Sequence, residues 1–304
     1  MSTWMSRRVA GSPFDGELDG PAWDGRALLF CNATKNEIWR LDEAKDAPTL
    51  ARAQTVRTRG LAFAPDGRLY GAQTRARRIV WYRDDGASYY VESAIEGARR
   101  NDPLHLVVDR SGRIWSTDRW TEESSGGPVG FPPLAHLSVL RLDPIGARDD
   151  GAGEWSLRRM TEDTTAPHGL ALSPDERTLY VTDDGDADQP PTLRAYAIAG
   201  DALSPGIVLR RYERGDGAAG MTVDASGKIV VAAGARDSAT GPRIEVLEPS
   251  GRLVTVTPTD AAAPTACAFG GRALDVLYVT SGDGELLAFR DTGLRGVPRE
   301  GGPL

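Results

Sequence analysis

The chain has 304 residues, a formal net charge of −7 and two cysteines. An acidic balance argues against nucleic-acid binding, because that function requires a basic face. No apolar run of about 18 residues and no basic-then-apolar leader is present, so we expect no membrane span, no secretory signal and a cytoplasmic location. The cysteines, Cys31 and Cys267, lie in strand-like segments far apart in the sequence and are expected to be buried thiols rather than a disulfide.

A short motif recurs six times along the chain. Each copy begins at a variable residue, usually followed by Gly, and runs through an apolar strand and a tight turn into a second apolar strand. The copies span residues 19–32, 59–73, 104–118, 168–183, 219–234 and 266–282. Self-similarity at roughly 40–50 residues is typical of propeller blades, so six copies predict six blades.

Turn glycines and alternating side chains make each copy a β-hairpin. Gly67, Gly112 and Gly227 stand where a tight turn requires positive φ. A weaker hairpin follows each first one, which gives the four antiparallel strands of a propeller blade. The last blade lacks an outer strand, and residues 4–10 are predicted to supply it. We therefore expect an all-β, six-bladed β-propeller that forms a single domain over residues 1–304 and is closed by the N-terminal strand.

The residues that begin the innermost strands should form a ring at one end of the central channel. The ring residues are Asp19, Arg59, Leu104, His168, Ala219 and Ala266. A carboxylate, a guanidinium and an imidazole would thus face an apolar arc of Leu104, Ala219 and Ala266. We expect this ring to bind a small-molecule substrate.

A long insertion separates the third and fourth copies. Residues 119–137 read RWTEESSGGPVGFPPLAHL, and their glycines and prolines exclude regular structure. Loops of this length in compact domains are usually functional. The insertion is predicted to be a lid whose Trp120 and Phe131 contact the substrate; the alternative is a loop that packs on the rim of a blade.

Several of these segments resemble the blade motifs of the SMP-30/gluconolactonase/LRE-like family. They include DGPAWDG at 19–25, NDPLHLVVDRSGRIWSTD at 101–118 and APHGLALSPDERTLYVTDD at 166–184. The resemblance covers nearly the whole chain. It implies a six-bladed propeller, a lactonase or related esterase activity, and one divalent cation in the channel.

In that family a Glu, an Asn and an Asp hold the cation. By position, the resemblance carries these ligands onto Asp19, His168 and Ala219, and it carries a further P-N-D motif onto Pro103-Leu104-His105. Alanine cannot bind a metal, and the carboxylate missing there is also the family's usual general base. Calcium requires six to eight oxygen ligands, so we expect no tightly held metal.

A weakly bound Zn²⁺ or Ca²⁺ remains the alternative to a metal-free site. Its ligands would be Asp19 and His168. Because a stable zinc site usually has three protein ligands, His105 or Asp183 would have to complete it.

Without a metal, the side chains predicted to face the channel can still carry out acid–base chemistry. An imidazole titrates near neutral pH, so His168 is predicted to be a general base or acid, oriented by Asp19. Arg59 would stabilise negative charge on a substrate oxygen. His105 is a further catalytic candidate, but strand alternation leaves open whether its side chain points into the channel or between blades.

Three functions agree with this sequence. The first is hydrolysis of a lactone or ester, as the resemblance implies. The second is a metal-independent acid–base reaction, such as that of a cyclase, isomerase or lyase, on a larger apolar substrate. The third is a ligand-binding propeller without catalysis.

Overall fold

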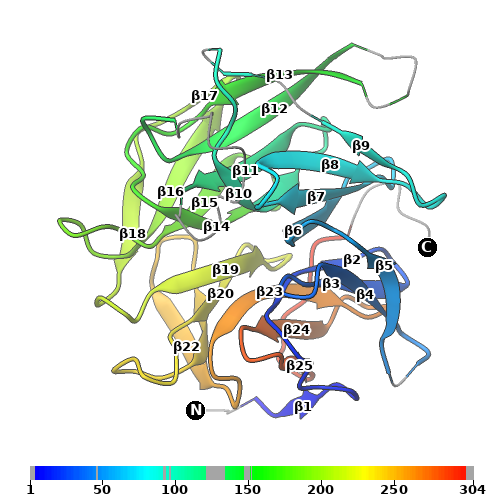
Figure 1. Cartoon of the computed structure of the whole chain (residues 1–304). Coiled ribbons are helices and arrows are strands. Elements are labelled where there is room, and N and C mark those ends of the chain that lie inside the picture. Colours follow the sequence, from blue (N-terminus) through cyan, green and yellow to red (C-terminus); the bar gives the residue numbers. More distant parts are fainter. Residues whose placement is uncertain are drawn as a thin grey trace.

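A computed structural model describes residues 4–45, 47–91, 94–95, 97–120, 134–146, 151 and 153–298. Its strands form six small antiparallel sheets arranged around one axis, which confirms the predicted six-bladed β-propeller (Figure 1). Every regular element in the described residues is a strand, so none of them forms a helix that could cross a membrane.

The first three blades follow the chain in order, each from its innermost strand outward. Blade 1 contains β2 (Leu18–Trp23), β3 (Ala27–Asn32), β4 (Glu37–Asp42) and β5 (Thr49–Ala53). Blade 2 contains β6 (Thr58–Phe63), β7 (Leu69–Gln73), β8 (Arg78–Tyr82) and β9 (Ser88–Tyr90). Blade 3 contains β10 (Asp102–Val108), β11 (Ile114–Arg119), β12 (Ser138–Gly146) and β13 (Glu154–Arg159).

The last three blades add one short extra strand and the N-terminal strand. Blade 4 contains β14 (Pro167–Leu172), β15 (Thr178–Asp183), β16 (Thr192–Ala199), the extra β17 (Ala202–Leu203) and the outer β18 (Ile207–Arg211). Blade 5 contains β19 (Ala218–Val223), β20 (Ile229–Ala233), β21 (Arg243–Leu247) and β22 (Leu253–Pro258). Blade 6 contains β23 (Pro264–Gly270), β24 (Val276–Ser281), β25 (Leu286–Phe289) and β1 (Ser6–Arg8).

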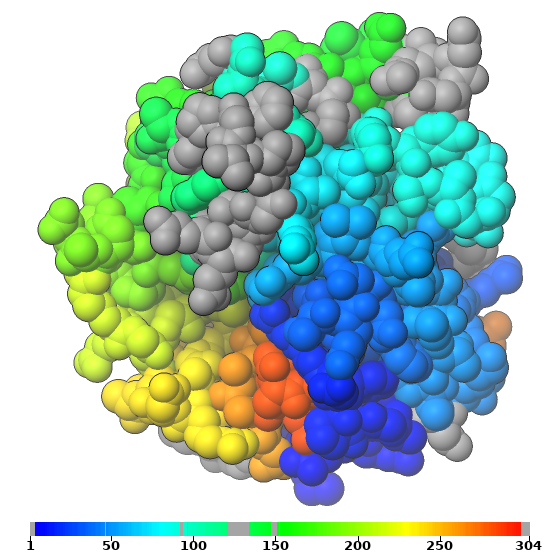
Figure 2. All heavy atoms as spheres, viewed as in Figure 1, coloured from blue at the N-terminus to red at the C-terminus, as the bar shows by residue number. Residues whose placement is uncertain are grey.

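The N-terminal strand closes the ring, as predicted. β1 pairs antiparallel with β25, with Ser6 opposite Phe289 and Arg8 opposite Leu287. The Trp4 ring meets the Phe289 ring edge to face at a centroid distance of 6.3 Å. On the surface, the blue N-terminal residues lie beside the orange and red residues of blade 6 (Figure 2). The first and last parts of the propeller are therefore held together in one sheet.

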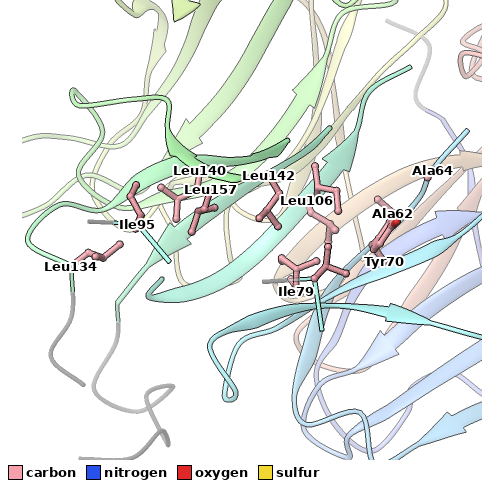
Figure 3. Packing of buried hydrophobic residues seen from close by; sticks show 13 residues of the cluster. Ala62, Ala64, Tyr70, Ile79, Ile95, Leu106, Leu134, Leu140, Leu142 and Leu157 are labelled. Atoms are coloured by element: carbon pink, nitrogen blue, oxygen red, sulfur yellow. The ribbon is translucent and has the colours of Figure 1, made fainter. Parts of the chain in front are cut away.

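Apolar side chains fill the spaces between neighbouring blades. Between blades 2 and 3, Tyr70 and Ile79 pack with Leu106, Leu140 and Leu142 (Figure 3). Cys31 and Cys267 lie in other clusters of this kind and are free and buried, as expected. The blades therefore share their cores, and burial of these side chains stabilises the ring as a whole.

Each innermost strand carries a bulge near its first residues. Relative to the second strand, one extra residue is inserted within the first few residues of the innermost strand in all six blades, and in blade 1 the bulge follows Asp19 rather than including it. Arg59, His105, His168 and Ala219 lie within these bulges. A bulge re-aims side chains, so the strand alternation that governs the rest of the blade does not hold here.

Glycines allow the innermost strands to approach one another beside the bulges. A Cβ atom on Gly60 would lie 2.6 Å from the Leu104 carbonyl oxygen, and one on Gly169 would lie 2.5 Å from that of Ala219. Gly20 and Gly220 meet the next strand in the same way. The equivalent place is taken by His105 in blade 3 and by Ala266 in blade 6.

Threonine hydroxyls join neighbouring blades beside three of the bulges. Thr74 donates to the Pro103 carbonyl at 2.9 Å, and Thr117 donates to the His168 carbonyl at 2.7 Å. The same bond joins Thr182 to Ala219 at 2.7 Å. One blade thus fixes the backbone of the candidate site residue in the next.

Candidate functional site

Asp19 and His105 form a buried carboxylate–imidazole pair. Asp19 is fully buried, and its Oδ1 accepts hydrogen bonds from His105 Nε2 at 2.9 Å and from the Gly20 amide at 2.8 Å. Burial raises the pKa of Asp19, but His105 and Arg59 outweigh it and hold the pKa well below its usual range. Because an ionised carboxylate only accepts, Nε2 of His105 carries a hydrogen and donates it to Asp19.

Arg59 is clamped between two carboxylates. Its Nε donates to Asp19 Oδ2 at 3.0 Å, and its Nη2 donates to Glu17. Nη1 makes no hydrogen bond within the part of the chain that the structure describes. The guanidinium therefore has one edge still able to donate.

His168 and Asp184 form a second carboxylate–imidazole pair. His168 Nδ1 lies 3.1 Å from Asp184 Oδ2, which also accepts a 2.7 Å hydrogen bond from Arg119. Burial raises the pKa of Asp184, but His168 and Arg119 together hold it well below its usual range. The ionised carboxylate fixes the hydrogen of His168 on Nδ1.

The other nitrogen of His168 is an available base. Nε2 is buried and has no hydrogen-bond partner among the described residues. Burial lowers the pKa of His168, despite the opposing effect of Asp184. The imidazole is therefore neutral near pH 7, with its lone pair on Nε2.

The two pairs meet in the channel. The rings of His105 and His168 are 5.5 Å apart between centroids and inclined at 57°. Asp19, Arg59 and Glu17 form a line of ion pairs behind His105, and Asp184 and Arg119 form an ion pair behind His168. Such an arrangement can remove a proton from one atom and return it to another.

Residues 18–283 match the family described as SMP-30/Gluconolactonase/LRE-like region. This chain belongs to that family. It is 27% identical over 241 residues to a gluconolactonase of Zymomonas mobilis, covering 71% of this chain and 64% of that protein. It is 29% identical over 190 residues to a 6-deoxy-6-sulfogluconolactonase of Pseudomonas putida, covering 61% of this chain and 55% of that protein. The chain thus spans less than two thirds of the length of these two relatives.

Solved structures of family members share the fold. The gluconolactonase XC5397 of Xanthomonas campestris superposes with a TM-score of 0.79 at 27% identity, covering 94% of this chain and 89% of that one. A luciferin-regenerating enzyme superposes with a TM-score of 0.74 at 18% identity, covering 99% and 100%, and at that identity it supports the fold alone.

The donors in this channel do not fit the divalent cation of the SMP-30/gluconolactonase/LRE-like family. Both oxygens of Asp19 accept hydrogen bonds, and the Arg59 guanidinium beside them repels a cation. Ala219 provides no ligand. In the described parts of the chain, no group of three His, Cys, Asp or Glu side chains is arranged to hold a metal.

The partner predicted for Asp19 was wrong. Asp19 was expected to orient His168, whereas the carboxylate bonds to His105 and His168 bonds to Asp184. The cause is the blade 3 bulge, which puts His105 at the place that glycine occupies in four other blades. This also settles the direction of its side chain, which points across the channel.

The predicted apolar arc is only partly present. Leu104 and Ala266 are buried, at 3% and 5% exposure, and Ala219 is half-buried. Ala266 also lies one position beyond the start of the repeat, where Thr265 stands and donates to the Leu18 carbonyl at 2.6 Å. Contact of Leu104 and Ala266 with a substrate stays a prediction.

The predicted lid falls mainly outside the described residues. Phe131 and the rest of 121–133 are among the residues that the structure does not describe. Trp120 is half-buried, and the Arg77 guanidinium lies 5.0 Å from the centroid of its ring. The lid and its contacts stay predictions.

Glu17, Arg119 and Asp184 belong to the site and were missed from the sequence. Asp184 directly follows Asp183, the last residue of β15. Asp183 does bind the turn, accepting from Thr165 and Ala166, but Asp184 points to His168. A signal for this contact was present in the sequence. His168 lies at the start of a β-hairpin and Asp184 directly follows its second strand, so both lie at the same end of the hairpin.

A cavity of about 1210 Å³ occupies the other end of the channel. Its walls are the later parts of the innermost strands and the turns after them, including Phe63, Leu172 and Met221. Of the paired residues, His105 lines it, whereas Arg59, His168 and Asp184 do not. The reactive groups and this cavity thus meet at His105.

Proposed function

We propose that this chain hydrolyses a lactone or related ester, with His168 as general base and without a divalent cation. The observation that carries the proposal is the state of His168, whose Nδ1 is held by ionised Asp184 while the buried Nε2 has no hydrogen-bond partner in the described chain. Relatives named gluconolactonases support hydrolysis of a small molecule at the level of the family.

The reaction needs one water molecule and two proton transfers. His168 Nε2 takes a proton from water as the water oxygen attacks the carbonyl carbon. The carbon–oxygen bond to the leaving group then breaks, and the imidazolium returns the proton to the departing alkoxide. A lactone gives one hydroxy acid. Asp184 stabilises the imidazolium through Nδ1.

Arg59 and His105 have supporting tasks in this mechanism. Negative charge that develops on the carbonyl oxygen requires a donor, and Nη1 of Arg59 is the open edge of a guanidinium already fixed by Glu17 and Asp19. His105 donates to Asp19 through Nε2, so in the neutral imidazole Nδ1 accepts a hydrogen bond from water or a substrate hydroxyl.

The facing imidazoles also favour a second candidate function. Two rings 5.5 Å apart beside a large cavity could move a proton between two atoms of one apolar substrate, as an isomerase or lyase requires. The absence of hydrolysis across a broad panel of lactones and aryl esters would favour this reaction.

Removal of His168 tests the proposal. General acid–base catalysis contributes about 10²–10⁴-fold, so His168→Ala should lose that much kcat toward the best lactone or aryl ester of a panel assayed with chelator present. Glu154→Ala, at an exposed residue that begins β13, serves as the control and should retain activity. Near-normal turnover by a folded His168→Ala variant would sink the proposal.

A further inference from the structure

The cavity follows the channel from the candidate site to the opposite mouth. At the site end it is lined by Gly20, Gly60, His105 and Gly220, which stand at or beside the bulges. At the other end it is lined by turns that follow the innermost strands, such as Pro65 and Pro174. At about 1210 Å³ it is larger than the roughly 300–1,000 Å³ typical of small-molecule pockets.

The walls between these ends are apolar. Strand alternation sends every second side chain into the channel. Cys267 and Phe269 pack in a cluster between blades, so Ala268 between them faces the channel. Thr222 faces it for the same reason, and it is the one hydroxyl among the described innermost-strand residues that line the cavity.

Charged side chains along the cavity gather at the far mouth. Arg40 lies there with both of its partners, Asp24 at 2.7 Å and Asp42 at 2.7 Å. Arg110 and Glu176 also lie at this mouth and bond to each other through the Arg110 amide at 3.0 Å. A ligand portion between His105 and this rim would meet mainly apolar side chains.

Such walls discriminate between substrates by polarity. The hydroxyls of a sugar lactone would lose water there and find few hydrogen-bond partners, whereas an alkyl or aryl group would gain by leaving water. His105 connects this space to the reactive groups, because it lines the cavity, bonds to Asp19 and lies 5.5 Å from His168 between ring centroids.

We propose that the cavity holds an apolar arm of the substrate, so that the chain acts on lactones or esters bearing a long alkyl or aryl substituent. The proposal rests on the hydrolytic function above and specifies its substrate class. The carbonyl group lies at the paired histidines, and the arm extends from His105 toward the far mouth.

A homologous series of γ-lactones with side chains from methyl to octyl tests this. Each buried methylene is expected to raise kcat/KM about fourfold until the cavity is filled. Ala268→Trp places an indole in the cavity and should lower the octyl-to-methyl ratio of kcat/KM at least tenfold. Ala199→Trp, at an exposed residue that ends β16, should leave that ratio unchanged.

The outcomes separate this inference from the proposed function. Two results would overturn the apolar arm and leave the hydrolase proposal intact. One is His168-dependent hydrolysis whose kcat/KM does not rise with chain length. The other is an octyl-to-methyl ratio of kcat/KM that is equal in the two tryptophan variants. If no lactone is hydrolysed, the hydrolase fails, and the cavity is judged by calorimetric binding of the octyl lactone. Binding that is tighter than for the methyl lactone and weakened by Ala268→Trp supports the cavity site; binding that is equal in both variants overturns it.

Discussion

At the scale of single residues, two histidines obtain different chemistry from their neighbours. His105 donates through Nε2 to a buried carboxylate, whereas His168 donates through Nδ1 and keeps Nε2 free of partners in the described chain. The carboxylate that fixes an imidazole also decides which of its nitrogens can act as a base.

Asp184→Asn should therefore impair the base and shift its titration. Asp184 raises the pKa of His168, while burial and Arg119 lower it, so loss of the carboxylate should move the pKa further down. The acidic limb of the kcat/KM profile should move to lower pH, and kcat should fall about 10²-fold or more, because Asn no longer fixes the tautomer.

The measurement is a pH–rate profile of both proteins between about pH 4 and 8. Asp188→Asn, at an exposed carboxylate of the same loop, is the control and should keep the original profile. An acidic limb that stays in place at full kcat in Asp184→Asn would remove Asp184 from the mechanism.

The sequence predicted which residues approach the channel better than it predicted their partners. Asp19, Arg59 and His168 were recognised because each begins a repeat whose period is visible. The Asp19–His105 bond was not, because the bulge breaks the alternation on which side-chain directions are judged. Asp184 was missed because adjacent aspartates after a strand look the same whether they cap a turn or bond to a histidine.

At the scale of elements, strands with a buried face were the predictable ones. Alternation and turn glycines revealed the inner strands of all six blades. Outer strand β5 has exposed side chains at four of its five positions and so carries no alternating pattern, and the extra strand β17 has only two residues. Their pairing depends on neighbouring strands, which the local sequence does not describe.

Deleting residues 1–10 should destabilise the propeller. The deletion removes β1, the Val9–Leu286 backbone hydrogen bond of 2.9 Å and the Trp4–Phe289 contact, and it exposes the edge of β25. A loss of about 3 kcal/mol corresponds to a fall in Tm of roughly 5–10 °C.

Thermal unfolding followed by circular dichroism measures this effect. Arg7→Ala keeps the backbone pairing of β1 and changes only an exposed side chain, so its Tm should match that of the intact chain. A deletion variant that melts with the intact chain would show that β1 adds nothing to ring closure.

At the scale of the whole molecule, hydrogen bonds and ion pairs between side chains and backbone of the chain itself join the innermost strands of the propeller. The bonds from Thr74, Thr117 and Thr182 join successive blades, and the ion pairs of Arg59 occupy the space beside Asp19. Stability of the propeller should then not depend on a cation.

We accordingly expect the purified protein to contain less than one equivalent of calcium or zinc. Elemental analysis after gel filtration without added metal gives the content, and melting with and without a chelator gives the effect. Tm and hydrolysis should not change with chelator or with excess calcium. A full equivalent of metal, or a Tm that falls with chelator, would contradict a metal-free channel.

The bulge shared by all six innermost strands also bears on how this fold diverges. Residues such as Arg59, His168 and Ala219 stand between paired positions of the ladder, so exchanging their side chains leaves the pairing on either side intact. Mutations there change chemistry at little expense to folding, and each blade can be altered independently of the others. A lineage can therefore replace its ligands one blade at a time while the scaffold persists, and an engineer could follow the same path by substituting only bulge residues.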